Sequence, residues 1–77
     1  MVHRGWLRPQ RPPFGVPRTA YQLALGRGAV VYTWRVGRRW MAHIKASKYG
    51  RLVGVLEGLR TRDRVAKVAT AFWKEWA

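Results

Sequence analysis

Residues 30–46 read VVYTWRVGRRWMAHIKA and carry the clearest structural pattern in the chain. Residues 30–36 are mostly β-branched or aromatic, which favours a strand. The dipeptide Gly37-Arg38 can then turn the chain, and apolar residues alternate with mostly basic ones over residues 39–46. The stretch therefore predicts a β-hairpin whose second strand has one apolar face and one basic face.

A third strand and a helix are expected after this hairpin. A second turn at residues 47–50 leads into a strand over residues 51–57, where Gly54 marks a bulge or a close packing contact. Thr61 can cap a helix that runs from about residue 62 to residue 76. We expect this helix to cover the sheet with one apolar stripe, because a three-stranded sheet alone is only marginally stable. The stripe consists of Val65, Val68, Ala69, Phe72 and Trp76.

The beginning of the chain differs in composition from the rest. Residues 1–18 contain all four prolines and no acidic residue, and proline favours extended backbone. We expect an extended, flexible basic arm. Part of this arm could be docked onto the domain by Trp6, Leu7 and Phe14. The arginines of this arm are Arg4, Arg8, Arg11 and Arg18.

The predicted fold class is α+β. The arm of residues 1–18 precedes one small domain over residues 19–77, in which a three-stranded antiparallel meander packs against one C-terminal helix. Residues 19–25 are too few for a firm assignment and form either a helical turn or an entry strand.

The composition excludes several classes of function. The 77 residues carry 16 Lys and Arg against three Asp and Glu, a formal net charge of +13, so we expect a densely anionic partner and a monomeric state. Cysteine is absent, and two His with three acids offer no catalytic pair or metal site, so we expect no enzyme, cofactor or metal. No apolar run approaches the ~20 residues of a membrane span, and no secretory signal is recognisable. A cytoplasmic location is expected, at the nucleoid if the partner is DNA.

The period-two rule assigns the strand residues to two faces. The face expected beneath the helix holds Tyr32, Trp34, Val36, Trp40, Ala42, Ile44, Leu52 and Leu56. The opposite face combines positive charges with no acid, which is typical of a nucleic-acid-binding surface but also of a sheet whose charges are merely solvated. With Arg38 of the turn, its candidate contacts are Thr33, Arg35, Arg38, Arg39, Met41, His43, Lys45, Arg51 and Val53. The arm arginines are expected to add phosphate contacts.

Three aromatic or titratable positions allow more than one interpretation. His43 is either a contact to nucleic acid or an ordinary exposed histidine. Trp34 and Trp40 could stack on bases, but their phase favours the core. Trp73 lies beside the helical stripe and packs on the arm or contacts a partner.

A longer pattern resembles a known family. It comprises RWMAHIK at residues 39–45, Gly50-Arg51, and GLRTR at residues 58–62 before the predicted helix. Over residues 29–76 the chain resembles the three-stranded-sheet-plus-helix DNA-binding domain of plant AP2 factors and the arm-binding N-terminal domains of phage and transposon integrases.

The residues that carry this resemblance lie on the second strand and at the helix entry. The second-strand pattern is matched by Trp40, Ala42 and Ile44, and the helix entry by Gly58, Leu59 and Thr61. The resemblance implies that the sheet face lies in the major groove of DNA. The chain departs from the plant members at His43 and Val53, where acidic or aromatic contacts are common.

These observations predict a small double-stranded-DNA-binding protein whose basic sheet face docks in the major groove, as an accessory or regulatory factor of a phage or mobile element. An RNA-binding or ribosome-associated protein would show the same charge. A small phage-type inhibitor would instead place its cationic surface and tryptophans against an acidic groove of a host protein. Action at a membrane surface is least favoured, because the charge is not confined to one amphipathic helix.

Overall fold

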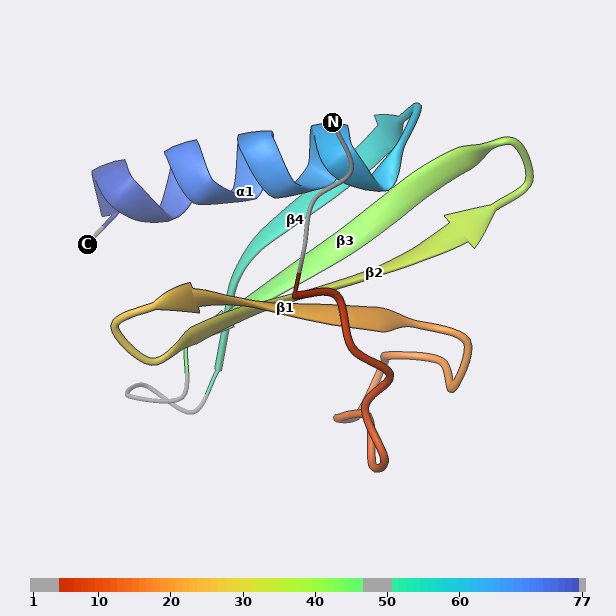
Figure 1. Ribbon diagram of the computed structural model, residues 1–77, viewed down its shortest axis with the longest axis horizontal. Helices are drawn as coiled ribbons and strands as arrows, with labels where there is room; N and C mark the ends of the chain where they lie inside the picture. The colour runs from red at the N-terminus through yellow and green to blue at the C-terminus, as the bar shows by residue number, and fades with distance from the viewer. Residues whose placement is uncertain (1–4, 47–50, 77) are drawn as a thin grey trace.

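The computed structural model describes residues 5–46 and 51–76. Four strands and a helix follow one another in these residues: β1 (Tyr21–Gly26), β2 (Ala29–Val36), β3 (Arg39–Ala46), β4 (Arg51–Leu59) and α1 (Arg62–Trp76). The strands form one antiparallel sheet in the order β1-β2-β3-β4, and α1 lies across one face of it (Figure 1). The α+β class with an antiparallel sheet and a C-terminal helix is confirmed, but the sheet has four strands rather than the three predicted.

The additional strand is β1, which the sequence left open between a helical turn and an entry strand. It pairs with β2 from Tyr21 opposite Thr33 to Gly26 opposite Ala29. The connecting residues support a tight hairpin, since Arg27 adopts a positive φ of 52°. A strand of six residues has little local signal, and its stability comes from pairing with β2.

The faces assigned to β2 were wrong by one residue. Thr33 pairs with Ala42, while Trp34 pairs with Met41, and directly paired residues share a face. The two-residue loop Gly37-Arg38 requires this register, because it sets Val36 opposite Arg39 and therefore pairs odd positions of β2 with even positions of β3. The predicted helix-covered positions Tyr32, Trp34 and Val36 consequently lie on the face away from α1.

The core beneath α1 is built from small and branched side chains. Its fully or nearly fully buried members are Leu23, Val31, Ala42, Ile44, Val65, Ala66 and Ala69. Gly54 satisfies both predictions made for it, because β3–β4 pairing shifts register beside it and the ring of Phe72 packs directly over it. The sheet and helix therefore pack closely at this glycine, where a Cβ atom would meet the ring of Phe72.

The helix has the predicted bounds and the predicted cap. The backbone N–H of Arg64 donates to Oγ1 of Thr61 over 3.1 Å. Trp73 is buried, and its indole N–H donates to the carbonyl of Gly26 over 2.9 Å, so it anchors α1 to the β1–β2 hairpin rather than to the arm. Trp76, which was expected in the buried stripe, is 39% exposed and stacks on Trp73.

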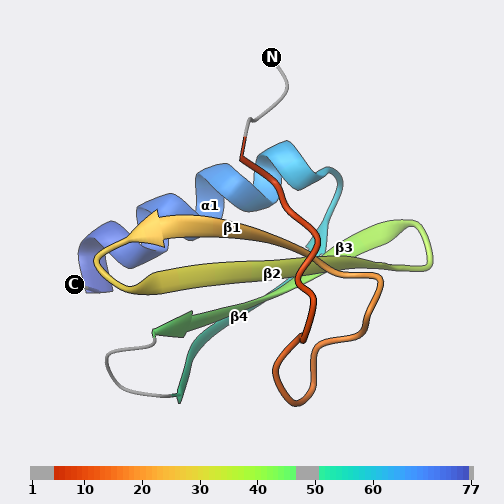
Figure 2. The ribbon, with the colours of Figure 1, turned by 60° about the horizontal axis from the view of Figure 1, so that its bottom comes forward.

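The arm wraps around the β1 edge of the sheet. Trp6 packs against the core beneath α1, and Leu7 forms an antiparallel bridge with Gln22 of β1. Farther along, Val16 and Ala20 pack on Trp34 at the opposite face. Figures 1 and 2 show the segment passing from the α1 side across β1 and ending in a loop below the sheet. The described part of the arm is therefore packed on the domain.

Candidate nucleic-acid interface

The sheet face away from α1, where the basic contacts were expected, is partly covered by the arm. Trp34 is 9% exposed beneath Val16 and Ala20, and Met41 packs in the same cluster. Lys45 also faces the arm and donates from Nζ to the carbonyl of Phe14 over 3.1 Å. This face is consequently not an open basic sheet.

His43 belongs to this covered face. Its ring meets Trp34 edge-on, with 4.9 Å between the ring centroids, and a Cβ atom at Gly15 of the arm would lie 4.0 Å from His43 Cε1. Burial, with a smaller contribution from the charge of Lys45, lowers the pKa of His43 below its ordinary value. A neutral imidazole at pH 7 is a packing group here rather than a cationic contact to phosphate.

The nine expected sheet contacts separate into three groups. Five of them are buried or contact other parts of the chain, so they are not on a free surface: Thr33, Met41, His43, Lys45 and Val53. Thr33 is fully buried, and its hydroxyl donates to the Met41 carbonyl over 2.8 Å, so its predicted place on the open face is wrong. Arg51 is exposed at the start of β4.

The remaining three candidates gather at the tip of the β2–β3 hairpin. Arg35, Arg38 and Arg39 are all exposed. Arg35 is paired with Trp40 and so lies on the α1 face, which makes its predicted place on the opposite face wrong. Arg39 lies on the face away from α1, as predicted, and Arg38 occupies the loop between the strands. Gly37 precedes it with a φ of 64°, which suits the first position of a type II′ hairpin turn. The tip thus presents guanidinium groups on both faces and at its end.

The hairpin tip extends beyond its neighbouring strand. The pairing of β1 begins at Tyr21 opposite Thr33, so residues 34–36 continue past the start of β1 (Figure 2). On the other side, Trp40 still pairs with Leu59 of β4. One edge of the tip is therefore free of a neighbouring strand among the described residues, which gives it the form of a projecting two-stranded ribbon.

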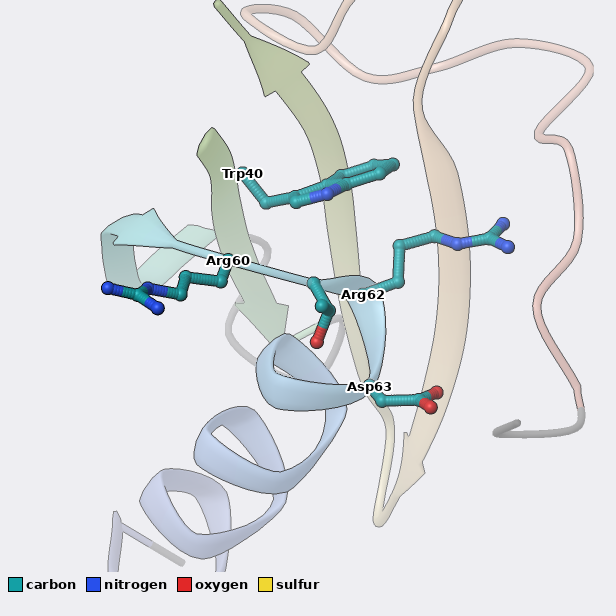
Figure 3. Close-up of a pocket in the computed structure, with 5 residues that line it drawn as sticks. Trp40, Arg60, Arg62 and Asp63 are labelled. Carbon is teal, nitrogen blue, oxygen red and sulfur yellow. The ribbon is translucent and has the colours of Figure 1, made fainter. Parts of the chain in front are cut away.

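Further arginines lie where β4 enters α1, next to this hairpin. A shallow pocket there is lined by Trp40, Arg60, Thr61, Arg62 and Asp63 (Figure 3). Arg60 is exposed, and Figure 3 shows its side chain directed away from that of Arg62. The end of the molecule that bears the hairpin tip is therefore rich in arginine.

Arg62 and Arg8 are held by aromatic rings, an arrangement that the sequence did not reveal. The guanidinium carbon of Arg62 lies 4.1 Å from the ring centroid of Tyr21 and about 6 Å from those of Trp6 and Trp40. Arg8 lies 3.9 Å from the Tyr21 centroid. These residues come from the arm, β1, β3 and α1, so no local pattern could have linked them.

The arm arginines have different environments. Arg8 donates to the Thr19 carbonyl over 2.7 Å and to the Tyr21 hydroxyl over 2.8 Å. These bonds hold the arm against the start of β1. Arg11 and Arg18 are exposed. Arg4 lies outside the described residues.

The chemistry offered by this end of the molecule is that of guanidinium groups. The planar guanidinium of arginine binds phosphate in a bidentate manner, and arginine also contacts O6 and N7 of guanine. Across residues 5–46 and 51–76, no three metal-ligating side chains come together, and no helix has the length and apolar character to cross a membrane.

No family model, curated protein or solved structure matches the chain. The resemblance to AP2 and integrase domains therefore stays a prediction. It spans the part of the chain that forms β2, β3, β4 and α1, and it does not include β1 or the wrapped arm.

Proposed function

We propose that this protein binds double-stranded DNA as an accessory or regulatory factor, with the β2–β3 hairpin tip entering the major groove. The observation that supports this most is the exposure of Arg35, Arg38 and Arg39 on a ribbon that extends beyond β1. A two-stranded ribbon fits the major groove of B-form DNA, and arginine is the side chain that most often reads guanine there. The proposal moves the contact from the open sheet face to the tip of the hairpin.

Charge supports the same assignment. The net charge of +13 makes any exposed ribbon strongly attractive to a polyanion, and the arginine-rich end concentrates that charge. Duplex DNA is favoured over duplex RNA, because the major groove of A-form RNA is too deep and narrow for side chains to read. Arg60 beside the ribbon, and Arg11 and Arg18 on the arm, are expected to contact phosphates.

Binding of a labelled mixed-sequence duplex, followed by fluorescence anisotropy at several salt concentrations, tests the proposal. The test variant combines Arg35→Gln, Arg38→Gln and Arg39→Gln. The control variant removes the same charge elsewhere, through Arg27→Gln, Lys67→Gln and Lys74→Gln. Arg27 and Lys74 line a separate pocket between the β1–β2 hairpin and the end of α1, and Lys67 is exposed on α1.

The hairpin variant is expected to lose at least about tenfold in affinity and to flatten the slope of log affinity against log salt by about 2 to 3. The control variant should lose much less. Equal losses in the two variants would reduce the binding to non-specific charge and reject the hairpin assignment. A matched RNA duplex that binds as tightly as DNA would reject the preference for DNA.

A further inference from the structure

Phe14 is the most exposed large apolar side chain among the described residues. The residue is 98% exposed, whereas the described tryptophans and Tyr21 pack against other parts of the chain. A phenylalanine this exposed contributes nothing to the core. Its partner must come from outside the chain if it has one.

The backbone that carries Phe14 is firmly positioned. The amide of Val16 donates to the carbonyl of Pro13 over 3.0 Å, closing a turn around Phe14 and Gly15. Lys45 of β3 donates to the carbonyl of Phe14 itself over 3.1 Å. Val16 is 7% exposed and packs with Trp34. The ring is thus presented from a fixed turn, which lowers the entropic cost of using it as a contact.

The surroundings of Phe14 select an anionic partner. Residues 1–18 contain no acid, and Arg11 and Arg18 on either side of Phe14 are exposed. An apolar ring among cations suits a ligand that combines aromatic faces with negative charge. Nucleic acid has this combination, since every base offers a face for stacking and every nucleotide carries a phosphate.

We propose that Phe14 is a wedge that stacks on a nucleobase of the bound duplex by partial insertion at a base step. Apolar side chains used in this way unstack neighbouring base pairs and bend the duplex. The proposal rests on the proposed DNA binding and adds a second contact to it, on the arm rather than on the hairpin. Arg11 and Arg18 would hold the flanking phosphates.

The test compares Phe14→Ala with Phe14→Trp and with Leu7→Ala. Leu7 is the matched control, because it is 61% exposed on the same arm and its bridge to Gln22 uses only backbone atoms. Binding is measured with a set of duplexes that each carry one 2-aminopurine, whose fluorescence rises when the base leaves the stack. Thermal melting of each variant checks that the fold is retained.

The wild-type protein and Phe14→Trp are expected to raise the fluorescence of 2-aminopurine at particular positions. Phe14→Ala should abolish this rise and weaken binding by roughly 5- to 150-fold, the range expected for losing one aromatic–base stack. Its salt slope should stay unchanged, because no charge is removed. Leu7→Ala should behave like the wild type.

Two results would overturn the wedge. Equal affinity and equal fluorescence for the wild type and Phe14→Ala would show that the ring does not contact bases. A loss of affinity of the same size in Leu7→Ala would assign the effect to general apolar surface. Either result leaves the hairpin proposal intact, since that depends on the arginine variants and their salt slopes, whereas a wild-type chain that binds no duplex would reject both.

Discussion

Gly54 lies where the ring of Phe72 of α1 packs directly on the sheet. A Cβ atom added there would lie 2.9 Å from Cε1 and Cζ of Phe72 and 3.4 Å from Cδ1 of Ile44. Gly54→Ala is therefore expected to destabilise the protein by about 1–3 kcal/mol through overpacking. Urea denaturation measures this difference in the free energy of unfolding between the wild type and Gly54→Ala directly.

The same substitution in a Phe72→Leu background provides the control. A smaller side chain above residue 54 relieves the overlap, so Gly54→Ala should then cost clearly less. An equal cost in both backgrounds would mean that the strain does not arise from Phe72.

His43 is expected to make stability depend on pH. Its pKa in the folded protein is lowered by burial and by Lys45, and unfolding returns that pKa toward its ordinary value of 6.5. The unfolded chain therefore takes up the proton more readily, and stability falls as the pH drops below 6.5 toward the lowered folded pKa. Above pH 6.5 the contribution of His43 to the stability of the protein is constant.

Denaturation curves at a series of pH values, for the wild type and His43→Gln, measure this effect. The stability of the variant should depend less on pH in the window below 6.5. Identical pH profiles for the two proteins would contradict the assignment to His43.

At the scale of elements, the wrapped arm is part of the folded structure. Val16 is 7% exposed where it covers Trp34, whereas Thr19, between the arm and β1, is exposed. Val16→Asp should cost about 2–4 kcal/mol, because it places an unpaired charge in that contact. Thr19→Asp should change stability by less than about 0.5 kcal/mol.

Urea denaturation of both variants tests the arm, together with the NMR shift of the Trp34 indole N–H. A Val16→Asp variant that is as stable as Thr19→Asp, with an unmoved Trp34 signal, would mean that the arm does not protect the sheet.

Elements with local signals were predicted well from the sequence. The helix, with bounds at Arg62 and Trp76, follows from the Thr61 cap and from an apolar repeat within one segment. β1 was not assigned, because its six residues are stabilised by pairing with β2. The phase of β2 was available in the sequence, since a two-residue loop at Gly37-Arg38 fixes which residues face each other.

The candidate site was predicted only in part, because its surroundings are non-local. The positive charge of Arg35, Arg38 and Arg39 was evident in the sequence, and all three are exposed. Alternation along β3 could not reveal that Phe14 and Gly15 of the arm lie against Lys45 and His43. A face that alternates polar and apolar residues is open only if no other segment covers it.

At the scale of the whole molecule, one end of the sheet carries the proposed DNA contacts and the other end does not. The hairpin tip and the β4–α1 junction bring Arg35, Arg38, Arg39 and Arg60 to one end. At the opposite end, the indole N–H of Trp73 in α1 donates to the carbonyl of Gly26 in the β1–β2 hairpin. A net charge of +13 attracts any polyanion to the whole surface, so the proposed docking of DNA differs from general attraction only in the location of the contact.

An amide NMR titration of the wild-type protein with a mixed-sequence DNA duplex tests this location most directly. Chemical-shift changes concentrated at residues 35–39, with residues 67–76 of α1 unchanged, are the predicted result. Changes of equal size at the hairpin tip and around Arg27 and Lys74, or none at the tip, would contradict the claim that the β2–β3 hairpin is the DNA-binding element.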